Sequence, residues 1–263
     1  MREGLDWLGR PPEIRATLPY RLLRGVVRVV LFGLLRFRIS TSGQENLPRG
    51  GYLLIAAAHR GWMDPLVVLH ALPPSPRAWF LGSAASTFTS PWRESIVRRV
   101  GGLLPVWRGG AGIDVHVASA RAVLERAGVF AQMPEGTVSG RPGTVGPFRI
   151  GAALIALRTG APIVPLAIAG TEELYIGKRM ASRVLPATSV AELLGTGWDG
   201  RPPAAGSRAE LELARRVTDR LSELLGPAVE ALWPGTVDPP GRPRRLRRRL
   251  TWLLLGRGPL ERE

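Results

Sequence analysis

Short apolar runs alternate with longer segments of helical periodicity between residues 52 and 225. Runs of four to six apolar residues bounded by polar or Gly/Pro positions are typical of buried strands, and alternation with helices is typical of α/β proteins. We therefore predict a mixed, largely parallel central sheet that is flanked by helices. The predicted strands are 52–57, 78–81, 103–106, 129–132 and 163–168, and the predicted helices are 65–72, 91–100, 114–127, 149–159 and 208–225.

A strongly amphipathic segment precedes the first of these strands. Apolar pairs recur every four residues between Leu22 and Leu35, which is helical spacing. Arg21, Arg24 and Arg28 lie mainly on the other side, a pattern typical of helices that lie in a membrane interface. The alternative is an ordinary helix that packs its apolar side on the core. We expect membrane contact, because the polar face carries only positive charge and favours anionic lipid.

The C-terminal end repeats this combination of basic and apolar residues. Six arginines between positions 242 and 249 precede the apolar run 250–255, in which Trp252 suits the headgroup boundary. A solvated tail or a nucleic-acid-binding arm is the alternative. The sequence thus divides into an interfacial segment (1–40), an α/β domain (41–233) and a Pro/Arg-rich linker with a basic tail (234–263).

The balance of charges indicates an anionic partner. The 263 residues include 36 basic and 21 acidic side chains, a formal net charge of +15. Nucleic acid, an acidic membrane and a phosphorylated substrate would each satisfy this charge, but aromatic residues, at 6%, are too few for a base-stacking surface. We therefore expect an anionic membrane surface and no nucleic acid.

Composition also limits the chemistry and the location. The chain has no cysteine and three histidines, so a thiol nucleophile is excluded and a metal centre is not expected. Uncharged apolar runs such as 29–35 are far shorter than the roughly 20 residues that span a bilayer, and no secretory signal pattern is present. We expect a monotopic protein on the cytoplasmic face of the cell membrane.

Chemically unusual residues follow three predicted strands, in the segments 58–64, 107–110 and 133–137. Ligands of open α/β sheets bind beyond the carboxyl ends of the strands. His59 and Asp64 could not pair on one continuous helix, but Pro65 favours a helix start, so Asp64 is expected as the cap and 59–63 as a loop that brings the two together. A neutral imidazole oriented by a carboxylate is a competent base near pH 7.

Four motifs in order carry a family resemblance. Gly43-Gln-Glu-Asn-Leu-Pro48 precedes His59-x-x-x-x-Asp64, and the others are Gly102-Leu-Leu-Pro-Val-Trp-Arg108, Met133-Pro-Glu-Gly-Thr137 and Val164-Pro-Leu-Ala-Ile168. Together they cover about residues 40–175. In these motifs the chain resembles the glycerolipid acyltransferases of the 1-acylglycerol-3-phosphate acyltransferase (PlsC-like) family.

The resemblance implies transfer of a fatty acyl group from acyl-CoA or acyl-carrier protein to the hydroxyl of 1-acylglycerol-3-phosphate, in phospholipid biosynthesis. His59 would act as the general base and Asp64 would hold it. No covalent intermediate, metal or bound cofactor is implied, since the acyl thioester is a cosubstrate. The resemblance also assigns four residues to acceptor binding: Arg108, Glu135, Gly136 and Thr137.

One position departs from the family pattern. The third motif usually continues with arginine, whereas Val138 follows Thr137 here, so a phosphate-binding charge is missing. Arg141, in a Gly/Pro-rich loop, is a candidate substitute. The departure leaves another lysophospholipid or a lipid alcohol open as the acceptor. A non-catalytic membrane-binding protein of the same fold is a further alternative, against which the intact His59 and Asp64 argue.

Overall fold

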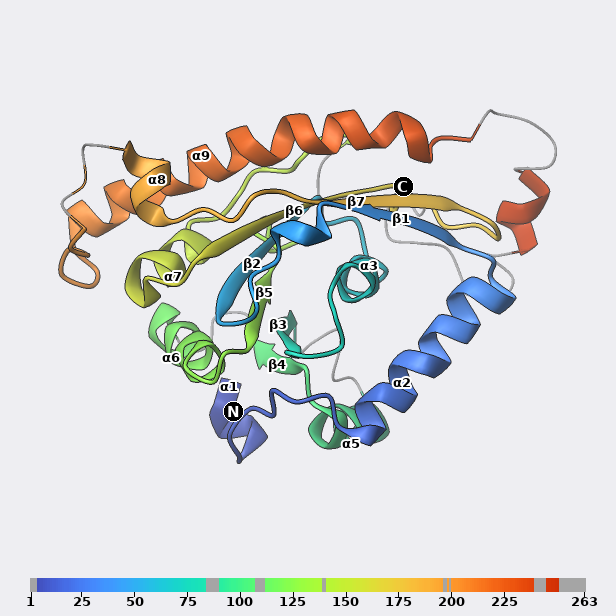
Figure 1. Cartoon of the computed structure of the whole chain (residues 1–263), viewed down its shortest axis with the longest axis horizontal. Coiled ribbons are helices and arrows are strands. Elements are labelled where there is room, and N and C mark those ends of the chain that lie inside the picture. The colour runs from blue at the N-terminus through green and yellow to red at the C-terminus, as the bar shows by residue number, and fades with distance from the viewer. Residues whose placement is uncertain are drawn as a thin grey trace.

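Seven strands form one mixed, largely parallel sheet. The computed structural model describes residues 4–83, 90–106, 112–138, 141–195, 198, 200–238 and 245–250. Along the sheet the strands follow the order β1-β7-β6-β2-β5-β3-β4, and the neighbouring pairs are parallel except β6 with β7 (Figure 1). The strands are β1 (Arg38–Ser42), β2 (Tyr52–Ala57), β3 (Ala78–Ser83), β4 (Leu103–Val106), β5 (Val129–Gln132), β6 (Ile163–Ala169) and β7 (Arg179–Val184).

Both faces of the sheet are buried, which explains why its central strands are apolar throughout. Side chains of a strand alternate between the two faces. Leu53 and Ile55 of β2 join one core cluster, while Tyr52 and Leu54 join the other. The four β2 residues from Leu53 to Ala56 are at most 1% exposed, as expected of a strand covered on both sides.

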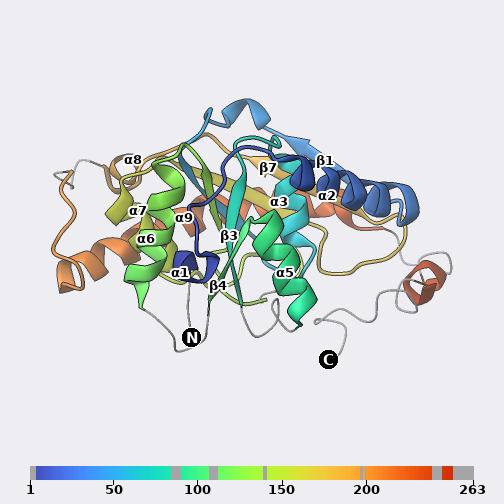
Figure 2. The same cartoon turned by 90° about the horizontal axis from the view of Figure 1, so that it is seen from below.

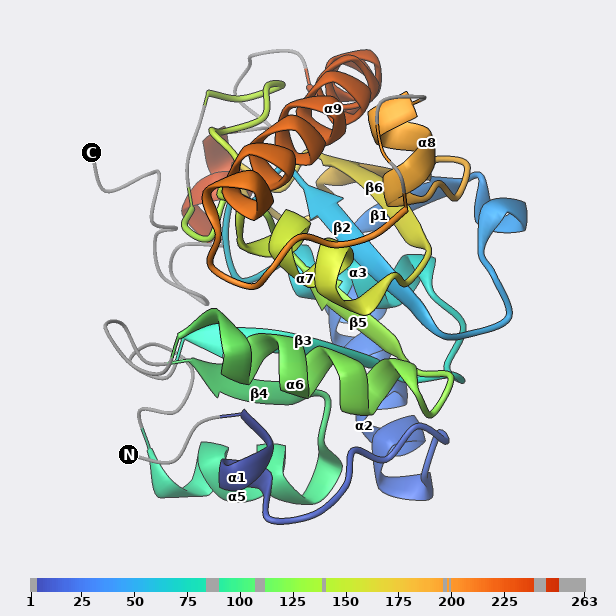
Figure 3. The ribbon, with the colours of Figure 1, turned by 90° about the vertical axis from the view of Figure 1, so that its left-hand side faces the viewer.

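Helices cover the two faces unequally. One face carries α6 (Ile113–Leu124), α7 (Gly151–Thr159), α8 (Val190–Leu194) and the long α9 (Arg208–Leu232), as Figures 1 and 3 show. The other face packs against α3 (Asp64–Ala71) and the π-helical turn η1 (Val29–Leu34). In Figure 2, β3 and β4 lie between α6 and α5 (Pro91–Val100). The short elements are α1 (Gly4–Leu8), η2 (Gln44–Asn46) and η4 (Trp233–Thr236).

The predicted fold class and the five predicted strands are confirmed, but two strands were missed. β1 and β7 pair with each other at one end of the sheet and contain polar residues among the apolar ones. Their apolar content was too low to predict a strand from a continuous hydrophobic run. The predicted end of the last helix was also wrong, because α9 continues through Pro227 to Leu232 with Ala228 and Val229 packed in the core.

The N-terminal segment forms α2 (Leu18–Arg28), which continues into η1. Tyr20 and Arg24 face the protein: the Tyr20 ring lies 4.2 Å from the Arg77 guanidinium carbon, and the Arg24 guanidinium donates to the carbonyls of Leu69 and Leu72 at the end of α3. Arg24 therefore lies on the side of α2 that faces the protein. The outward face is apolar, with five residues more than half exposed: Leu18, Leu22, Val26, Val29 and Leu34.

Part of the basic C-terminal tail contacts the domain. Residues 245–250 are helical, and the flanking positions 242–244 and 251–263 lie outside the described residues. Arg247 forms an ion pair of 3.2 Å with Asp238, and Arg248 forms one of 2.8 Å with Glu173. In the described part of the chain, no helix is long and apolar enough to cross a membrane.

A buried ion pair joins the helices on the α9 face. Arg158 of α7 donates to both carboxylate oxygens of Glu210 at 2.6 and 2.8 Å, and to Asp114 of α6 at 2.5 Å. The Glu210 side chain is fully buried, and its hydrogen bonds with Arg158 are the main cause of its lowered pKa. This pair fixes the start of α9 against the end of α7.

We expect Arg158→Met to lower the free energy of unfolding at pH 7 by about 3 kcal/mol, because it leaves a buried carboxylate without a cation. In the wild type this contribution is present above the ordinary Glu pKa of about 4.3 and is lost as the pH falls through the lowered pKa of Glu210. The difference between the two proteins should therefore narrow in acid. Urea unfolding between pH 7 and pH 3 measures it.

Arg208→Met is the matched control. Its guanidinium pairs with Glu212 at 2.9 Å, but both side chains are exposed, so the expected change is below about 0.5 kcal/mol. Equal effects of the two substitutions at pH 7, or a difference that does not depend on pH, would contradict the role assigned to Arg158.

Candidate active site

Two neighbouring strands bring the candidate residues together. β2 and β5 are parallel, and Ile55 of β2 is paired with Gln132 of β5. Both strands end within two residues of this pair, so the loops that follow them leave the same edge of the sheet. The first loop contains His59, and the second contains Glu135.

A fully buried carboxylate holds the histidine. His59 Nδ1 lies 2.7 Å from Asp64 Oδ2, and the Asp64 side chain is 0% exposed. The His59 side chain is 22% exposed, and its Nε2 has no hydrogen-bond partner among the described residues. Because a carboxylate can only accept, it selects the tautomer with the proton on Nδ1 and leaves a lone pair on Nε2. The geometry is that of a base with an orienting carboxylate.

The same carboxylate oxygen shapes the loop. Asp64 Oδ2 also accepts from the backbone N–H groups of Arg60 at 2.6 Å and Gly61 at 2.7 Å. The predicted cap role of Asp64 was wrong: α3 starts at Asp64, Met63 is the capping position, and no side chain caps the helix. The Asp64 side chain turns back to the preceding loop, where two amides and the imidazole provide three donors to one oxygen.

Glu135 contacts the histidine loop from the neighbouring strand. It is 2% exposed, and its Oε1 accepts from the backbone N–H of His59 at 3.1 Å and of Gly146 at 3.4 Å. Burial raises the pKa of this carboxyl, and the two backbone donors act in the opposite direction. The resemblance placed Glu135 in acceptor binding, whereas its described contacts are with the backbone that carries His59.

Arg60 was not identified from the sequence as a site residue. It is 4% exposed, and its Nη2 donates to the carbonyls of Arg141, at 2.7 Å, and Thr144. Burial lowers the pKa of its guanidinium, while the carboxylates of Glu135, Glu172 and Asp64 raise it. Nothing in the sequence distinguishes this arginine from the many others, since its role depends on a turn 81 residues further on.

The remaining predicted residues lie around this centre or outside the described chain. Gly136 has φ +65°, and a Cβ there would lie 3.0 Å from Arg149 Cδ. Thr137 is half-buried and the Arg141 side chain is exposed. Arg108 lies outside the described residues, although β4, which precedes it, ends at the same edge of the sheet as β5.

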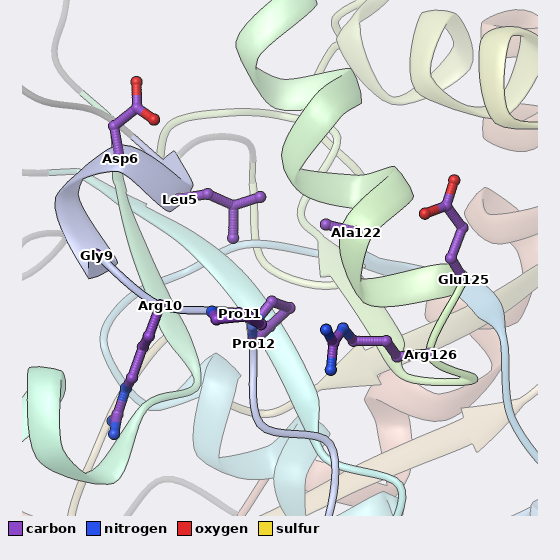
Figure 4. A pocket seen from close by; sticks show the side chains of 9 residues that line it. All are labelled: Leu5, Asp6, Gly9, Arg10, Pro11, Pro12, Ala122, Glu125 and Arg126. Atoms are coloured by element: carbon purple, nitrogen blue, oxygen red, sulfur yellow. The ribbon is translucent and has the colours of Figure 1, made fainter.

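The hollow in Figure 4 belongs to a different part of the molecule. Its volume is about 680 Å³, and Leu5, Pro12, Ala122 and Arg126 are among its lining residues. It lies between the N-terminal segment and the end of α6, which leads into the amino end of β5. The histidine lies beyond the carboxyl ends of the strands, so this hollow is not the site of the His59–Asp64 pair.

We expect Asp64→Ala to lower the free energy of unfolding by about 3 kcal/mol, because three donors lose their common acceptor inside the protein. Asp64→Asn retains a carbonyl oxygen and should cost about 1 kcal/mol. Asp219→Ala, at an exposed position of α9, is the control and should change stability by less than about 0.5 kcal/mol. Chemical denaturation measures all three, and an Asp64→Ala protein as stable as Asp219→Ala would contradict the described geometry.

The sequence is similar to those of curated proteins. An uncharacterised protein of Mycobacterium tuberculosis is 30% identical over 183 residues, which are 65% of this chain and 47% of that protein. This chain thus spans about half the length of that curated relative. The 1-acyl-sn-glycerol-3-phosphate acyltransferase of Borreliella burgdorferi is 26% identical over 163 residues, 60% of this chain and 62% of its own.

The fold also has a solved counterpart. The crystal structure of PlsC, the 1-acyl-sn-glycerophosphate acyltransferase of Thermotoga maritima, matches with a TM-score of 0.57 and 20% identity, over 81% of this chain and 79% of that one. The acyltransferase family model matches residues 38–169, half of the chain. This range includes both the histidine loop and the Glu135 loop. The chain therefore belongs to the acyltransferase family.

Proposed function

We propose that this protein transfers a fatty acyl group from an acyl thioester, acyl-CoA or acyl-carrier protein, to the hydroxyl of 1-acylglycerol-3-phosphate. The observation that carries the proposal is the His59–Asp64 pair, in which a buried carboxylate orients a partly exposed imidazole. Membership of the acyltransferase family supports the reaction class. The names of the Borreliella and Thermotoga proteins support the acceptor.

In the proposed reaction, His59 acts as the general base. Its Nε2 takes the proton from the acceptor hydroxyl while the hydroxyl oxygen attacks the thioester carbonyl carbon. The resulting tetrahedral oxyanion collapses with cleavage of the carbon–sulfur bond, and the thiolate leaves and takes the proton from the imidazolium. Asp64 stabilises the imidazolium between these steps. An ester and a free thiol are the products, and no covalent acyl-enzyme is formed.

Positive charge near the site supports a phosphorylated acceptor. Arg141 and Arg149 are exposed residues of the segment that follows the Glu135 loop, and Arg149 lies against Gly136. Arginine binds phosphate with paired, charge-assisted hydrogen bonds. Val138, at the position where the family pattern has arginine, favours a second candidate, an acceptor without this phosphate. Comparison of acceptors decides between the two.

We expect thiol release from palmitoyl-CoA that depends on lysophosphatidate and falls at least about 10²-fold in His59→Ala, the range lost with a general base. The protein contributes no thiol background, because it contains no cysteine. His116→Ala, which changes a histidine of α6, is the control and should retain activity. Monoacylglycerol and other lysophospholipids are compared as acceptors. Full activity of His59→Ala would overturn the proposed base, and equal turnover of charged and uncharged acceptors would overturn the proposed acceptor.

We also propose that α2 binds an anionic membrane, so that a monotopic enzyme meets its lipid substrates on the cytoplasmic face. The outward side of α2 and η1 is apolar, and Arg21 and Arg28 are exposed beside it. An apolar face between basic residues fits an anionic lipid surface. The contacts of Tyr20 and Arg24 with the domain hold the opposite side of the helix, so its apolar side cannot turn inward without breaking them.

We expect the double variant Leu22→Glu/Val26→Glu to reduce partitioning onto phosphatidylglycerol-containing vesicles at least about tenfold, since it places two charges in the lipid-facing side. Leu224→Glu makes the same change at an exposed leucine of α9 and should bind like the wild type. Vesicle sedimentation measures both. Unchanged vesicle binding of the double variant would refute the proposal that α2 binds the membrane.

A further inference from the structure

The turn from Arg141 to Thr144 lies directly behind the histidine loop. The Arg141 carbonyl accepts from the Thr144 backbone N–H at 3.2 Å and from the Thr144 hydroxyl at 2.8 Å, which closes the turn. Gly146, two residues later, donates its N–H to the Glu135 oxygen that also accepts from His59. One carboxylate oxygen thus binds both the His59 backbone and the residue that lies two positions after the turn, and Arg141 is exposed.

Arg60 fastens this turn from the inner side. Its Nη2 donates to the first and last carbonyls of the turn, those of Arg141 and Thr144. Both bonds arise from one nitrogen of a residue that is 4% exposed, so the guanidinium is enclosed in the protein. Three carboxylates, of Glu135, Glu172 and Asp64, provide the electrostatic compensation that keeps a buried guanidinium charged.

Trp233 limits the turn from the other side. Gly143 has φ +75°, and a Cβ there would lie 2.8 Å from the indole of Trp233. The indole is itself fixed, because its Nε1 donates to Glu172 at 3.1 Å. Arg60 thus holds the two ends of the turn, and the fixed ring of Trp233 packs against its third residue, Gly143.

We infer that Arg60 is a specificity-determining positioning residue, which holds the turn 141–144 so that the Arg141 guanidinium binds the phosphate of the acceptor. This inference rests on the proposed acyl transfer and deepens it. Val138 lacks the positive charge that the family pattern has at this position. Arg141, three residues later in the turn that Arg60 holds, provides a positive charge. Arg60 itself does not touch the acceptor, so its removal affects phosphate binding through Arg141.

Arg60→Lys is the informative substitution. Lysine keeps the positive charge but lacks the planar guanidinium whose Nη2 reaches two carbonyls at once. We expect the KM for lysophosphatidate to rise about tenfold or more, the effect of a lost charge-assisted hydrogen bond, while kcat changes less than about threefold. The KM for monoacylglycerol, which has no phosphate, should change less than about twofold. A loss of general structural integrity would lower kcat for both acceptors.

A double-variant cycle tests the dependence on Arg141. Arg141→Gln alone should raise the KM for lysophosphatidate at least as much as Arg60→Lys, and the double variant should be no worse than Arg141→Gln. Gly143→Ala disturbs the turn from the Trp233 side and should give the same selective rise. Arg121→Lys is the control: Arg121 of α6 also donates to a carbonyl, that of Arg158 at 2.8 Å, and the ratio of the two KM values should stay at the wild-type value.

Activity of the wild type distinguishes failure of the proposed acyl transfer from failure of the role assigned to Arg60. Absence of acceptor-dependent thiol release from the wild type would reject the proposed acyl transfer. A second result is that the wild type turns over lysophosphatidate while Arg60→Lys and Gly143→Ala raise the KM for lysophosphatidate and the KM for monoacylglycerol equally, or raise neither. That result would reject the role of Arg60 and leave the proposed acyl transfer in place. Multiplicative effects of Arg60→Lys and Arg141→Gln would reject it as well.

Discussion

One buried oxygen organises the candidate active site. Asp64 Oδ2 accepts from the His59 ring and from the amides of Arg60 and Gly61, so a single acceptor fixes both the shape of the loop and the orientation of the imidazole. The loop needs this acceptor because its amides are buried and have no strand or helix to pair with. A carboxylate at the first residue of α3 therefore shapes the loop and also orients the imidazole of the proposed base.

Three charged side chains in and next to the histidine loop each have one buried atom without a hydrogen-bond partner among the described residues: Asp64 Oδ1, Arg60 Nη1 and Glu135 Oε2. Their charges compensate one another without forming a simple ion pair. Apart from the bond between Asp64 and the His59 ring, their hydrogen bonds are with backbone groups. Such an arrangement binds loops to one another and stabilises little by itself. It is the means by which the loops after β2 and β5 and the turn 141–144 form one unit.

The sequence predicted the central sheet and the pair His59 and Asp64, because both depend on local signals. Continuous apolar runs indicate the strands, and a proline at the start of a helix indicates that His59 and Asp64 lie in and next to the preceding loop. It missed β1 and β7, whose pairing is set by position in the sheet and not by hydrophobicity. It also missed Arg60, and it placed Arg24 with Arg21 and Arg28 on the polar side of the helix without indicating that Arg24 binds carbonyls at the end of α3. In a chain with 36 basic residues, composition cannot separate buried arginines that bind carbonyls from those that face a partner.

Asp64 selects the tautomer of His59 that has its proton on Nδ1 and a free lone pair on Nε2. Histidine ¹⁵N NMR of the full chain at pH 8 tests this directly, because only three histidines contribute and His59→Ala assigns the signal. We expect a pyrrole-type Nδ1 and a pyridine-type Nε2 for His59. The opposite tautomer would overturn the proposed role of His59, because Nε2 could not then accept the proton of a hydroxyl.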